Sequence, residues 1–384
     1  MTQRYDVIVV GAGIQGAGIA QACALNGWRV KVLERNSHPG RETSSASSKL
    51  IHGGLRYLET LQLHLVYECL AERKRLLANA PSITHLAKFY IPVYKRSRRR
   101  PLWIFAGLGL YALLGGLTPA NRFRKLNRGE WPSLPIRQEG LKAVFQYQDG
   151  QTDDLQLTEA VLRSAQRLGA ELSVDAEVRA LRARSQYLEV TTQSETLRTR
   201  CLINAAGPWV NEVAMLLPQT SQMPLDWVQG VHILLPRPAP IGCFYVEAPT
   251  DGRPMFVLPW RGQTLVGTTE HALSSPEASP TEEEIDYLLQ AYNRYFPEHA
   301  CTREGVVEVM AGVRVLPKNE KSANARHRET QLREWREDGT LYLGVYGGKL
   351  TSYRAVAEKV SYRVASCLGV PTGAVKTTRC LSLE

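Results

Sequence analysis

The sequence predicts an α/β fold in which a parallel sheet covered by helices is combined with an inserted antiparallel sheet. Three observations support this prediction. First, the chain opens with an apolar run, a glycine turn, a helix-period segment and a second apolar run between Tyr5 and Glu34. Second, a strand, a small-residue turn and a helix start recur at residues 201–213. Third, residues 223–270 hold short β-rich runs separated by Gly and Pro, which is typical of antiparallel strands.

The opening segment has the pattern of a dinucleotide-binding turn. Its first apolar run ends at three glycines, Gly11, Gly13 and Gly16, and its second closes on Glu34. Such glycines allow a tight turn, close approach of a pyrophosphate and close packing of helix on sheet, while free N–H groups at the helix start attract the anion. Glu34 is placed to accept both ribose hydroxyls, and an acid there disfavours the 2′-phosphate of NADP.

Composition and charge limit the classes of protein. The 44% hydrophobic content is that of an ordinary globular protein, and 384 residues suffice for two or three structural units. The formal net charge of +10 suggests an anionic partner such as a phosphorylated substrate, a membrane surface or nucleic acid. The seven cysteines never form a CxxC spacing, so we expect reduced thiols and no metal site. The first strand starts so close to Met1 that no cleavable signal fits, and a cytoplasmic protein is expected.

The loop after Glu34 has the composition of a ligand-binding loop. Residues 35–59 are rich in Ser, Gly and basic residues and show little apolar periodicity. Hydroxyl side chains stand at Thr43, Ser44, Ser45, Ser47 and Ser48, and charged or titratable ones at Lys49, His52 and Arg56. A run of small residues lets a cofactor lie along the backbone. Taken alone, the segment is equally compatible with a solvated polar loop.

Four motifs together resemble one enzyme family. They are SSASSKLIHGGLRYLE at 44–59, NAAGPWV at 204–210, AGVRVLP at 311–317 and GVYGGKLTSYR at 344–354. Over nearly its whole length the chain resembles the FAD-dependent glycerol-3-phosphate dehydrogenases. The resemblance implies a Rossmann-like FAD-binding domain of the glutathione-reductase and D-amino-acid-oxidase type, with FAD rather than a nicotinamide cofactor. The family continues into a further helical domain beyond the position of Glu384, so the chain resembles a short member.

The resemblance also implies the site residues. FAD is expected to contact Gly11, Gly13, Ile14, Gly16, Glu34, Arg35, Thr43, Ser44, Ser45, Ser48, Lys49, Leu50, Val178, Ala206, Gly207, Gly348, Lys349, Leu350 and Thr351. The implied substrate-binding residues are Arg56, Tyr57, Lys349 and Thr269, with Arg56 and Lys349 on the phosphate. Arg314 is implied at the reacting oxygens, and the general base is His52 or His232, between which the sequence does not decide. A helix expected from about Leu350 would stabilise negative charge on a reduced flavin.

The resemblance further implies a discontinuous division into two domains. Residues 1–80, 143–220 and 305–384 are expected to form the FAD-binding domain. Residues 81–142 and 221–304 are expected to form the domain that binds substrate and associates with the membrane.

One segment of the second domain is unusual in its apolar and basic character. A basic block, Tyr94 to Arg100, precedes Leu102 to Leu117, which carries no charge, and further basic residues follow from Arg122. The apolar run is short for a membrane span, which needs about 20 residues. The remaining alternatives are a buried helix with a solvated basic flank and a helix at the membrane interface. The resemblance favours a protein that is peripheral on the cytoplasmic face of the membrane.

The implied reaction is oxidation of sn-glycerol 3-phosphate to dihydroxyacetone phosphate. Hydride passes from C2 to flavin N5, and the electrons continue to membrane quinone. A related FAD oxidase or dehydrogenase of a hydroxy acid or an amine is the alternative. A nucleic-acid partner is not expected, because the basic residues are not interleaved with aromatic ones. Whether the enzyme is a homodimer is left open.

Overall fold

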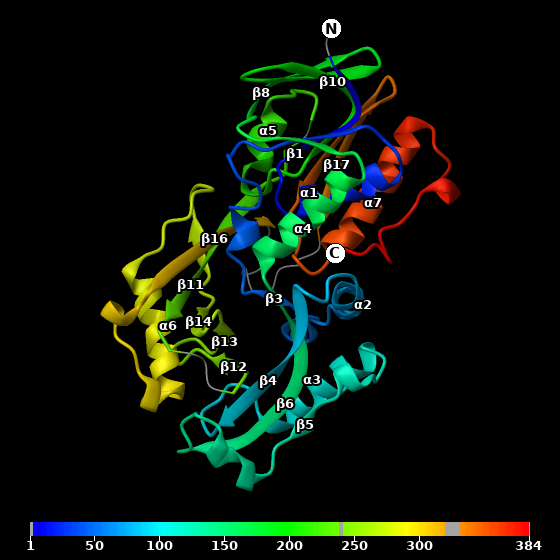
Figure 1. Cartoon of the computed structure of the whole chain (residues 1–384). Coiled ribbons are helices and arrows are strands. Elements are labelled where there is room, and N and C mark those ends of the chain that lie inside the picture. The colour runs from blue at the N-terminus through cyan, green and yellow to red at the C-terminus, as the bar shows by residue number, and fades with distance from the viewer. Residues whose placement is uncertain (1–2, 221, 238–240, 319–329, 384) are drawn as a thin grey trace.

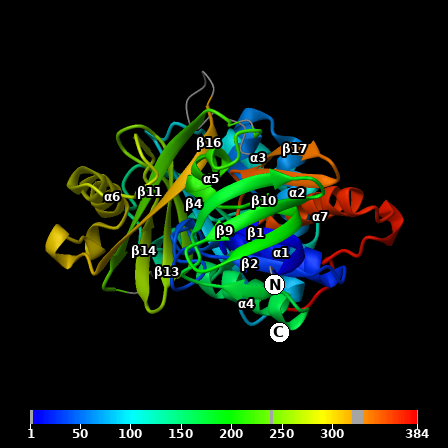
Figure 2. The same ribbon diagram turned by 90° about the horizontal axis from the view of Figure 1, so that it is seen from above.

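The computed structural model describes residues 3–220, 222–237, 241–318 and 330–383. These residues form two large sheets with helices packed against them, which confirms the α/β class (Figure 1). Seen from above, the first sheet with α1 (Ile14–Leu25) lies on one side of the molecule and the second sheet with α6 (Glu282–Tyr295) on the other (Figure 2).

The first sheet is parallel at its centre. Its central path runs β17-β18-β10-β1-β2-β7, and β9 joins it beside β10 and carries β8. The strands are β1 (Arg4–Val10), β2 (Val30–Leu33), β7 (Glu171–Ser173), β8 (Val178–Arg184), β9 (Tyr187–Thr192), β10 (Thr196–Asn204), β17 (Gln331–Glu337) and β18 (Thr340–Tyr346). β1 is fully apolar from Val7 to Val10 and buried, because it pairs with β10 on one side and β2 on the other.

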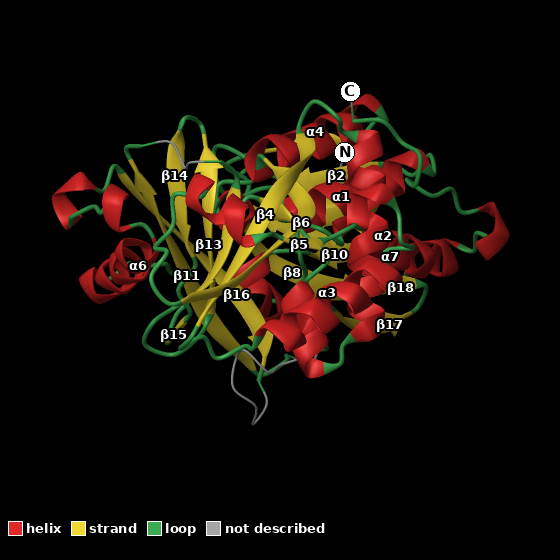
Figure 3. Ribbon diagram, turned by 90° about the horizontal axis from the view of Figure 1, so that it is seen from below, coloured by secondary structure: helices red, strands yellow, loops and turns green. Residues whose placement is uncertain are grey.

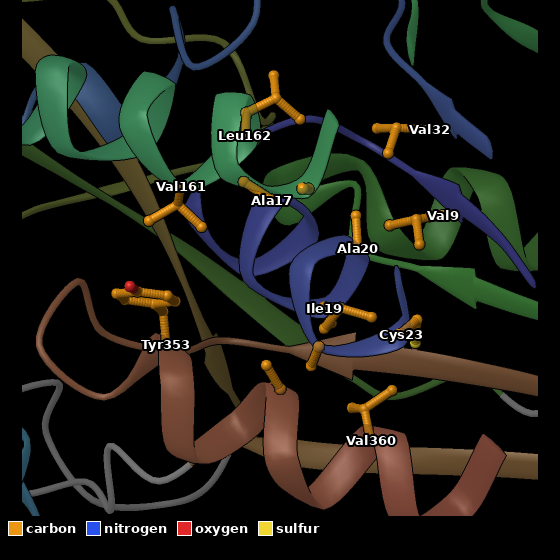
Figure 4. Packing of buried hydrophobic residues seen from close by; sticks show 14 of the residues in the cluster. Val9, Ala17, Ile19, Ala20, Cys23, Val32, Val161, Leu162, Tyr353 and Val360 are labelled. Atoms are coloured by element: carbon orange, nitrogen blue, oxygen red, sulfur yellow. The ribbon is translucent and has the colours of Figure 1, made fainter. Parts of the chain in front are cut away.

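Helix α1 is the centre of the core below this sheet. It packs against α4 (Asp154–Arg167), α7 (Tyr353–Leu368) and the strands, so apolar residues occur all round it (Figure 4). Small residues of α1 allow α7 to approach it closely. A Cβ added to Gly18 of α1 would lie 2.4 Å from the ring of Tyr353 in α7. Asp153 caps α4 by accepting a hydrogen bond from the Gln156 N–H, as expected for the acid that begins this helix.

The second sheet is mostly antiparallel and follows the order β15-β11-β14-β13-β12-β4-β6-β3, with β16 on β11 and β5 on β6. Its strands are β3 (Leu50–Ile51), β4 (Thr84–Tyr94), β5 (Arg124–Lys125), β6 (Leu141–Thr152), β11 (Leu225–Leu235), β12 (Cys243–Glu247), β13 (Pro254–Trp260), β14 (Gln263–Gly267), β15 (His271–Leu273) and β16 (Glu308–Pro317). Alternate residues of β6 point to opposite faces: Val144 joins the core under α6, and Phe145 joins the core of α2 (Leu63–Asn79) and α3 (Pro101–Leu114).

The two sheets divide the chain differently from the expected domains, whose boundaries stay a prediction. β3, β6 and β16 were assigned to the FAD-binding domain, but they belong to the second sheet. β6 pairs with β4 along almost its whole length, and β16 pairs with β11 from Leu225↔Pro317 to Leu234↔Glu308. Helix α7 begins at Tyr353, so the residues from Lys349 to Ser352 form a turn where a helix was expected.

Helix α3 lies at the end of the molecule that carries β5 and β6, and α2 contacts it from the side nearer α7 (Figures 1 and 3). α3 is the apolar segment noted in the sequence. Its Leu108, Tyr111 and Ala112 are buried, whereas Leu102 is 75% and Trp103 is 72% exposed. The buried-helix alternative therefore holds for one face of α3 only. Within the described ranges, none of the helices combines the length and hydropathy needed to cross a bilayer.

Candidate active site

A cavity of about 550 Å³ lies between the two sheets. It is lined by the turn between β1 and α1, the loop before β3, the start of β8, the turn after β10, strands β11 and β16, and the turn before α7. The volume lies within the range usual for small-molecule and cofactor sites. Most of the expected cofactor contacts line it: Gly11, Gly13, Ile14, Glu34, Arg35, Thr43, Ser44, Ser48, Leu50, Val178, Ala206, Gly207, Gly348, Lys349, Leu350 and Thr351.

The glycine turn forms the anion-binding part of this cavity. Gly11 has a φ of +95°, and a Cβ there would lie 2.7 Å from the carbonyl oxygen of Ala205. Gly13 is the N-cap of α1 and offers no side chain, so the helix start is open toward the cavity. The Ile14 N–H donates to Ser44 Oγ at 2.9 Å. Gly16 has a packing role, because a Cβ there would meet the Gly11 carbonyl oxygen at 1.9 Å.

The carboxylate of Glu34 lines the cavity beside the glycine turn. Glu34 is buried, and its two oxygens accept hydrogen bonds from Ala12 N–H at 2.8 Å and Asn36 N–H at 2.9 Å. These bonds fix the carboxylate at the rim of the cavity, where its remaining lone pairs can accept ribose hydroxyls. Beside it, the Arg35 guanidinium lies 3.6 Å from the centre of the Trp209 ring.

Another part of the lining carries two cationic side chains, Arg314 and Lys349. His52, Tyr57 and His232 line the cavity as well. The Lys349 Nζ lies 4.0 Å from the centre of the Tyr57 ring, and among the described residues it has no hydrogen-bond partner although it is buried. A buried ammonium without a partner is costly, so the arrangement fits an anionic ligand.

Arg56 lies on the same aromatic ring. Its guanidinium carbon is 5.7 Å from the Tyr57 ring centre, and its buried Nη2 makes no hydrogen bond within the described part of the chain. Arg56 itself is outside the lining of the cavity, with Tyr57 between. Arg56 and Lys349 therefore both lie near the ring of Tyr57, which lines the cavity.

His232 is held in its neutral form. Its Nε2 lies 2.9 Å from Ser48 Oγ, and its buried Nδ1 has no hydrogen-bond partner in the described ranges. Burial, and then the positive charges of Lys49 and Arg314, lower the pKa of His232 to about 3. Arg314 Nη2 lies 3.4 Å from the Thr269 carbonyl oxygen, and a Cβ added to Gly230 of β11 would lie 2.9 Å from the same nitrogen.

Three expected site residues turn away from the cavity. Ser45 Oγ donates to backbone carbonyls of its own loop, and Lys49 Nζ forms a buried ion pair with Asp154 at 2.7 Å. Thr269 Oγ1 donates to Glu284 Oε1 at 2.5 Å and accepts from the Val231 N–H, so it supports the sheet. None of these three side chains is in the lining of the cavity, and each is held by a protein partner instead.

Three other residues line the cavity and were not singled out in the sequence. Gln15 lies in the first turn of α1, and its buried Oε1 has no partner among the described residues. Its position inside the glycine motif, between Ile14 and Gly16, is the signal that could have identified it. Thr268 lines the cavity in place of Thr269, and Trp209 covers Arg35. Nothing local in the sequence indicated the contact between Trp209 and Arg35.

The glycines and the donor groups fit an FAD molecule. A Cβ on Gly207 would meet nothing within 4 Å, although Gly207 lines the cavity with a φ of +55°, so space is kept open at this turn. The helix start suits a pyrophosphate, Glu34 suits the ribose, and the turn from Gly347 to Thr351 offers backbone groups at the far end.

Comparison with known proteins decides the family. Residues 6–363 match the model of the FAD dependent oxidoreductases, abbreviated DAO. The chain belongs to this family. FAD is therefore the cofactor of this DAO-family enzyme, and the FAD-binding domain type expected from the motifs is confirmed.

Individual relatives sharpen the comparison. A glycerol-3-phosphate dehydrogenase of Synechocystis sp. is 36% identical over 390 residues, which cover 94% of this chain and 70% of the relative. The glycerol-3-phosphate dehydrogenase from Bacillus halodurans, solved with FAD, has a TM-score of 0.73 at 26% identity, covering 98% of this chain and 67% of that one. Glycine oxidase from Geobacillus kaustophilus shares the fold, with a TM-score of 0.72 at 19% identity. The match covers 100% of this chain and 99% of the glycine oxidase. The resemblance to the dehydrogenases is confirmed, and the chain spans about two thirds of their length.

Proposed function

We propose that this DAO-family enzyme oxidises sn-glycerol 3-phosphate at C2 to dihydroxyacetone phosphate and passes the electrons to membrane quinone. FAD, when bound, supplies the acceptor for the hydride. The protein must bind the phosphate, orient the C2 hydroxyl, take its proton and keep water out. The relatives with the same printed activity support the substrate.

The observation that carries the proposal is the pair of buried cationic nitrogens near Tyr57. Lys349 Nζ and Arg56 Nη2 both lack hydrogen-bond partners among the described residues. A phosphate is nearly dianionic at neutral pH and has three acceptor oxygens, so it would satisfy the Lys349 ammonium in the cavity, and the positive charge of Arg56 beside the cavity would add to the attraction. A zwitterionic amino acid carries one carboxylate and would leave part of this cationic capacity unused.

Arg314 and the histidines are assigned to the reacting hydroxyl. The Arg314 fork can contact the C2 oxygen and stabilise the charge that develops there as the proton leaves. His52 is the proposed proton acceptor, because the pKa of His232 is lowered to about 3 and its Nε2 is engaged with Ser48. His232 then acts as a neutral hydrogen-bonding group beside the substrate.

The exposed face of α3 is the proposed contact with the membrane. Leu102, Trp103, Phe105 and Leu113 are more than half exposed, and exposed arginines precede and follow the helix. An apolar face between basic flanks suits an anionic lipid surface, with the helix lying in the interface. This contact would place the enzyme beside its quinone acceptor.

An anaerobic titration tests the reaction. Glycerol 3-phosphate is added to the purified yellow protein, and the absorbance of the oxidised flavin is followed. We expect bleaching at equimolar substrate and the appearance of dihydroxyacetone phosphate. Glycerol and glycine are the matched controls, since one lacks the phosphate and the other is the substrate named for the glycine oxidase that shares the fold. Bleaching by glycine alone would favour the amine-oxidising alternative and contradict the proposal.

A further inference from the structure

Tyr111 makes a buried connection between α3 and the loop that carries the substrate-binding residues. Its hydroxyl accepts a hydrogen bond from the Gly53 N–H at 2.8 Å and donates one to Asp149 Oδ2 at 2.6 Å. The other oxygen of Asp149 forms an ion pair with Arg73 Nη1 at 2.6 Å. The side chains of Tyr111, Asp149 and Arg73 are each at most 3% exposed, so water does not compete for these bonds.

The fit of Tyr111 against the loop is tight. A Cβ added to Gly53 would lie 2.4 Å from the Tyr111 hydroxyl, so the tyrosine occupies the space next to the backbone. Gly53 follows His52 directly and precedes η2 (Leu55–Thr60), which holds Arg56 and Tyr57. A fixed Gly53 N–H therefore fixes the start of the loop on which the three substrate-site residues stand.

The same helix presents its opposite face to the outside. Tyr111 is buried in the last turn of α3, whereas Leu102, Trp103 and Leu113 are exposed by 59–75%. The flanking Arg98, Arg100, Arg122 and Arg128 are exposed and leave the apolar face between positive charges. Helix α3 also contacts η2 and α2. A single rigid helix thus has an external face suited to anionic lipid and an internal hydroxyl that holds the substrate loop.

We propose that Tyr111 is a positioning residue that couples the outer face of α3 to the substrate loop. Contact of this face with an anionic lipid surface restrains α3, increases the fraction of time for which the Gly53 N–H is bonded, and lowers KM for the phosphorylated substrate. The proposal rests on the proposed function for its kinetic part only. Exchange of the Gly53 amide reports the coupling without any substrate.

Hydrogen–deuterium exchange on the FAD-loaded full chain is the first test. Vesicles containing phosphatidylglycerol should slow exchange in the peptide that covers residues 50–58, and vesicles of phosphatidylcholine alone should not. Tyr111→Phe keeps the ring and removes the hydroxyl, so exchange in this peptide should rise without vesicles and no longer respond to them. Trp103→Ser should behave like the parent without vesicles and lose the response. If phosphatidylglycerol vesicles leave exchange in this peptide of the parent unchanged, the proposal is overturned. This comparison uses the parent protein alone, so it does not depend on the folding of a variant.

Steady-state kinetics is the second test. Tyr111→Phe removes the bonds to both Gly53 and Asp149, and loss of the bond to the Gly53 N–H should raise KM for glycerol 3-phosphate by about 5- to 10-fold, with a smaller change in kcat. Tyr295→Phe is the matched control, because the Tyr295 hydroxyl is also in the core and donates to the Glu247 carbonyl at 2.7 Å, away from the loop. Equal KM values for both variants would contradict a positioning role.

Two further outcomes separate the proposals from each other. If Trp103→Ser instead changes the oligomeric state without vesicles, the exposed face of α3 binds a second copy and the lipid proposal is wrong. Loss of all flavin reduction in the parent would reject the proposed function and leave the exchange result standing.

Discussion

The Lys349 ammonium lies 4.0 Å from the centre of the Tyr57 ring and has no hydrogen-bond partner among the described residues, so a cation–π contact stabilises its charge. A cation over a ring gains part of what a hydrogen-bonded carboxylate would supply. This leaves the lysine available to a ligand, unlike Lys49, whose buried ammonium is paired with Asp154.

Lys349→Met should therefore weaken substrate binding without weakening the fold. Loss of a charged hydrogen bond corresponds to about a 10- to 100-fold rise in KM for glycerol 3-phosphate. The free energy of unfolding should not fall, because an unpaired buried charge is removed. Steady-state kinetics and urea unfolding measure the two effects. Lys359→Met, on the surface of α7, is the control, and an unchanged KM in Lys349→Met would remove Lys349 from the phosphate site.

Arg314 and Arg56 should differ in the kinetic parameter that they control. Arg314→Lys keeps the charge but loses the planar fork at the reacting oxygen, so kcat/KM should drop by about 100-fold or more with FAD retained. Arg56→Lys should act mainly on KM, since phosphate binding is common to the ground state and the transition state. Kinetics on both flavin-loaded variants separates the roles. Parent-like turnover of Arg314→Lys would show that this residue is not at the reacting carbon.

Gly13→Val should give protein without FAD. A Cβ at this position already comes within 3.0 Å of Ser44 Oγ, and the two further methyl groups would fill the space that the pyrophosphate needs. The ratio of flavin absorbance to protein absorbance after purification measures the loss. Gly373→Ala should keep its flavin, because nothing lies within 4 Å of a Cβ there. A yellow Gly13→Val protein would place the pyrophosphate elsewhere.

The stability of the protein should depend on pH through His232. Its folded-state pKa of about 3 lies below the usual value near 6.5, so the unfolded chain binds the proton first as the pH falls. The contribution of the neutral histidine is complete above about pH 6.5 and is lost toward about pH 3, at up to ~1.4 kcal/mol per pH unit. Urea unfolding of the parent and His232→Asn across this window measures the difference. His271→Asn, an exposed histidine, should leave the slope unchanged; a parallel slope in His232→Asn would contradict the assignment.

Local sequence was sufficient for the parts of the site made by one continuous segment. Gly11, Gly13 and Glu34 belong to one turn and its two strands, and their spacing determines their geometry. Sheet membership was harder to predict, because β6 carries the same alternation whichever sheet it joins, and its pairing with β4 is decided by tertiary contacts. The contact of Arg35 with Trp209 joins segments far apart in the chain, and neither residue signals the other.

The pairing of β1 with β10 has a consequence for the newly made chain. Val7 lies opposite Cys201, and Cys201 in turn lies opposite Leu341, so β1 is synthesised well before its partner β10, and β10 before its partner β18. Non-local parallel pairing of this kind folds slowly. Until the ribosome has delivered β10, the apolar residues from Val7 to Val10 have no partner on that side. An unpaired apolar strand edge of this kind favours aggregation while it is exposed.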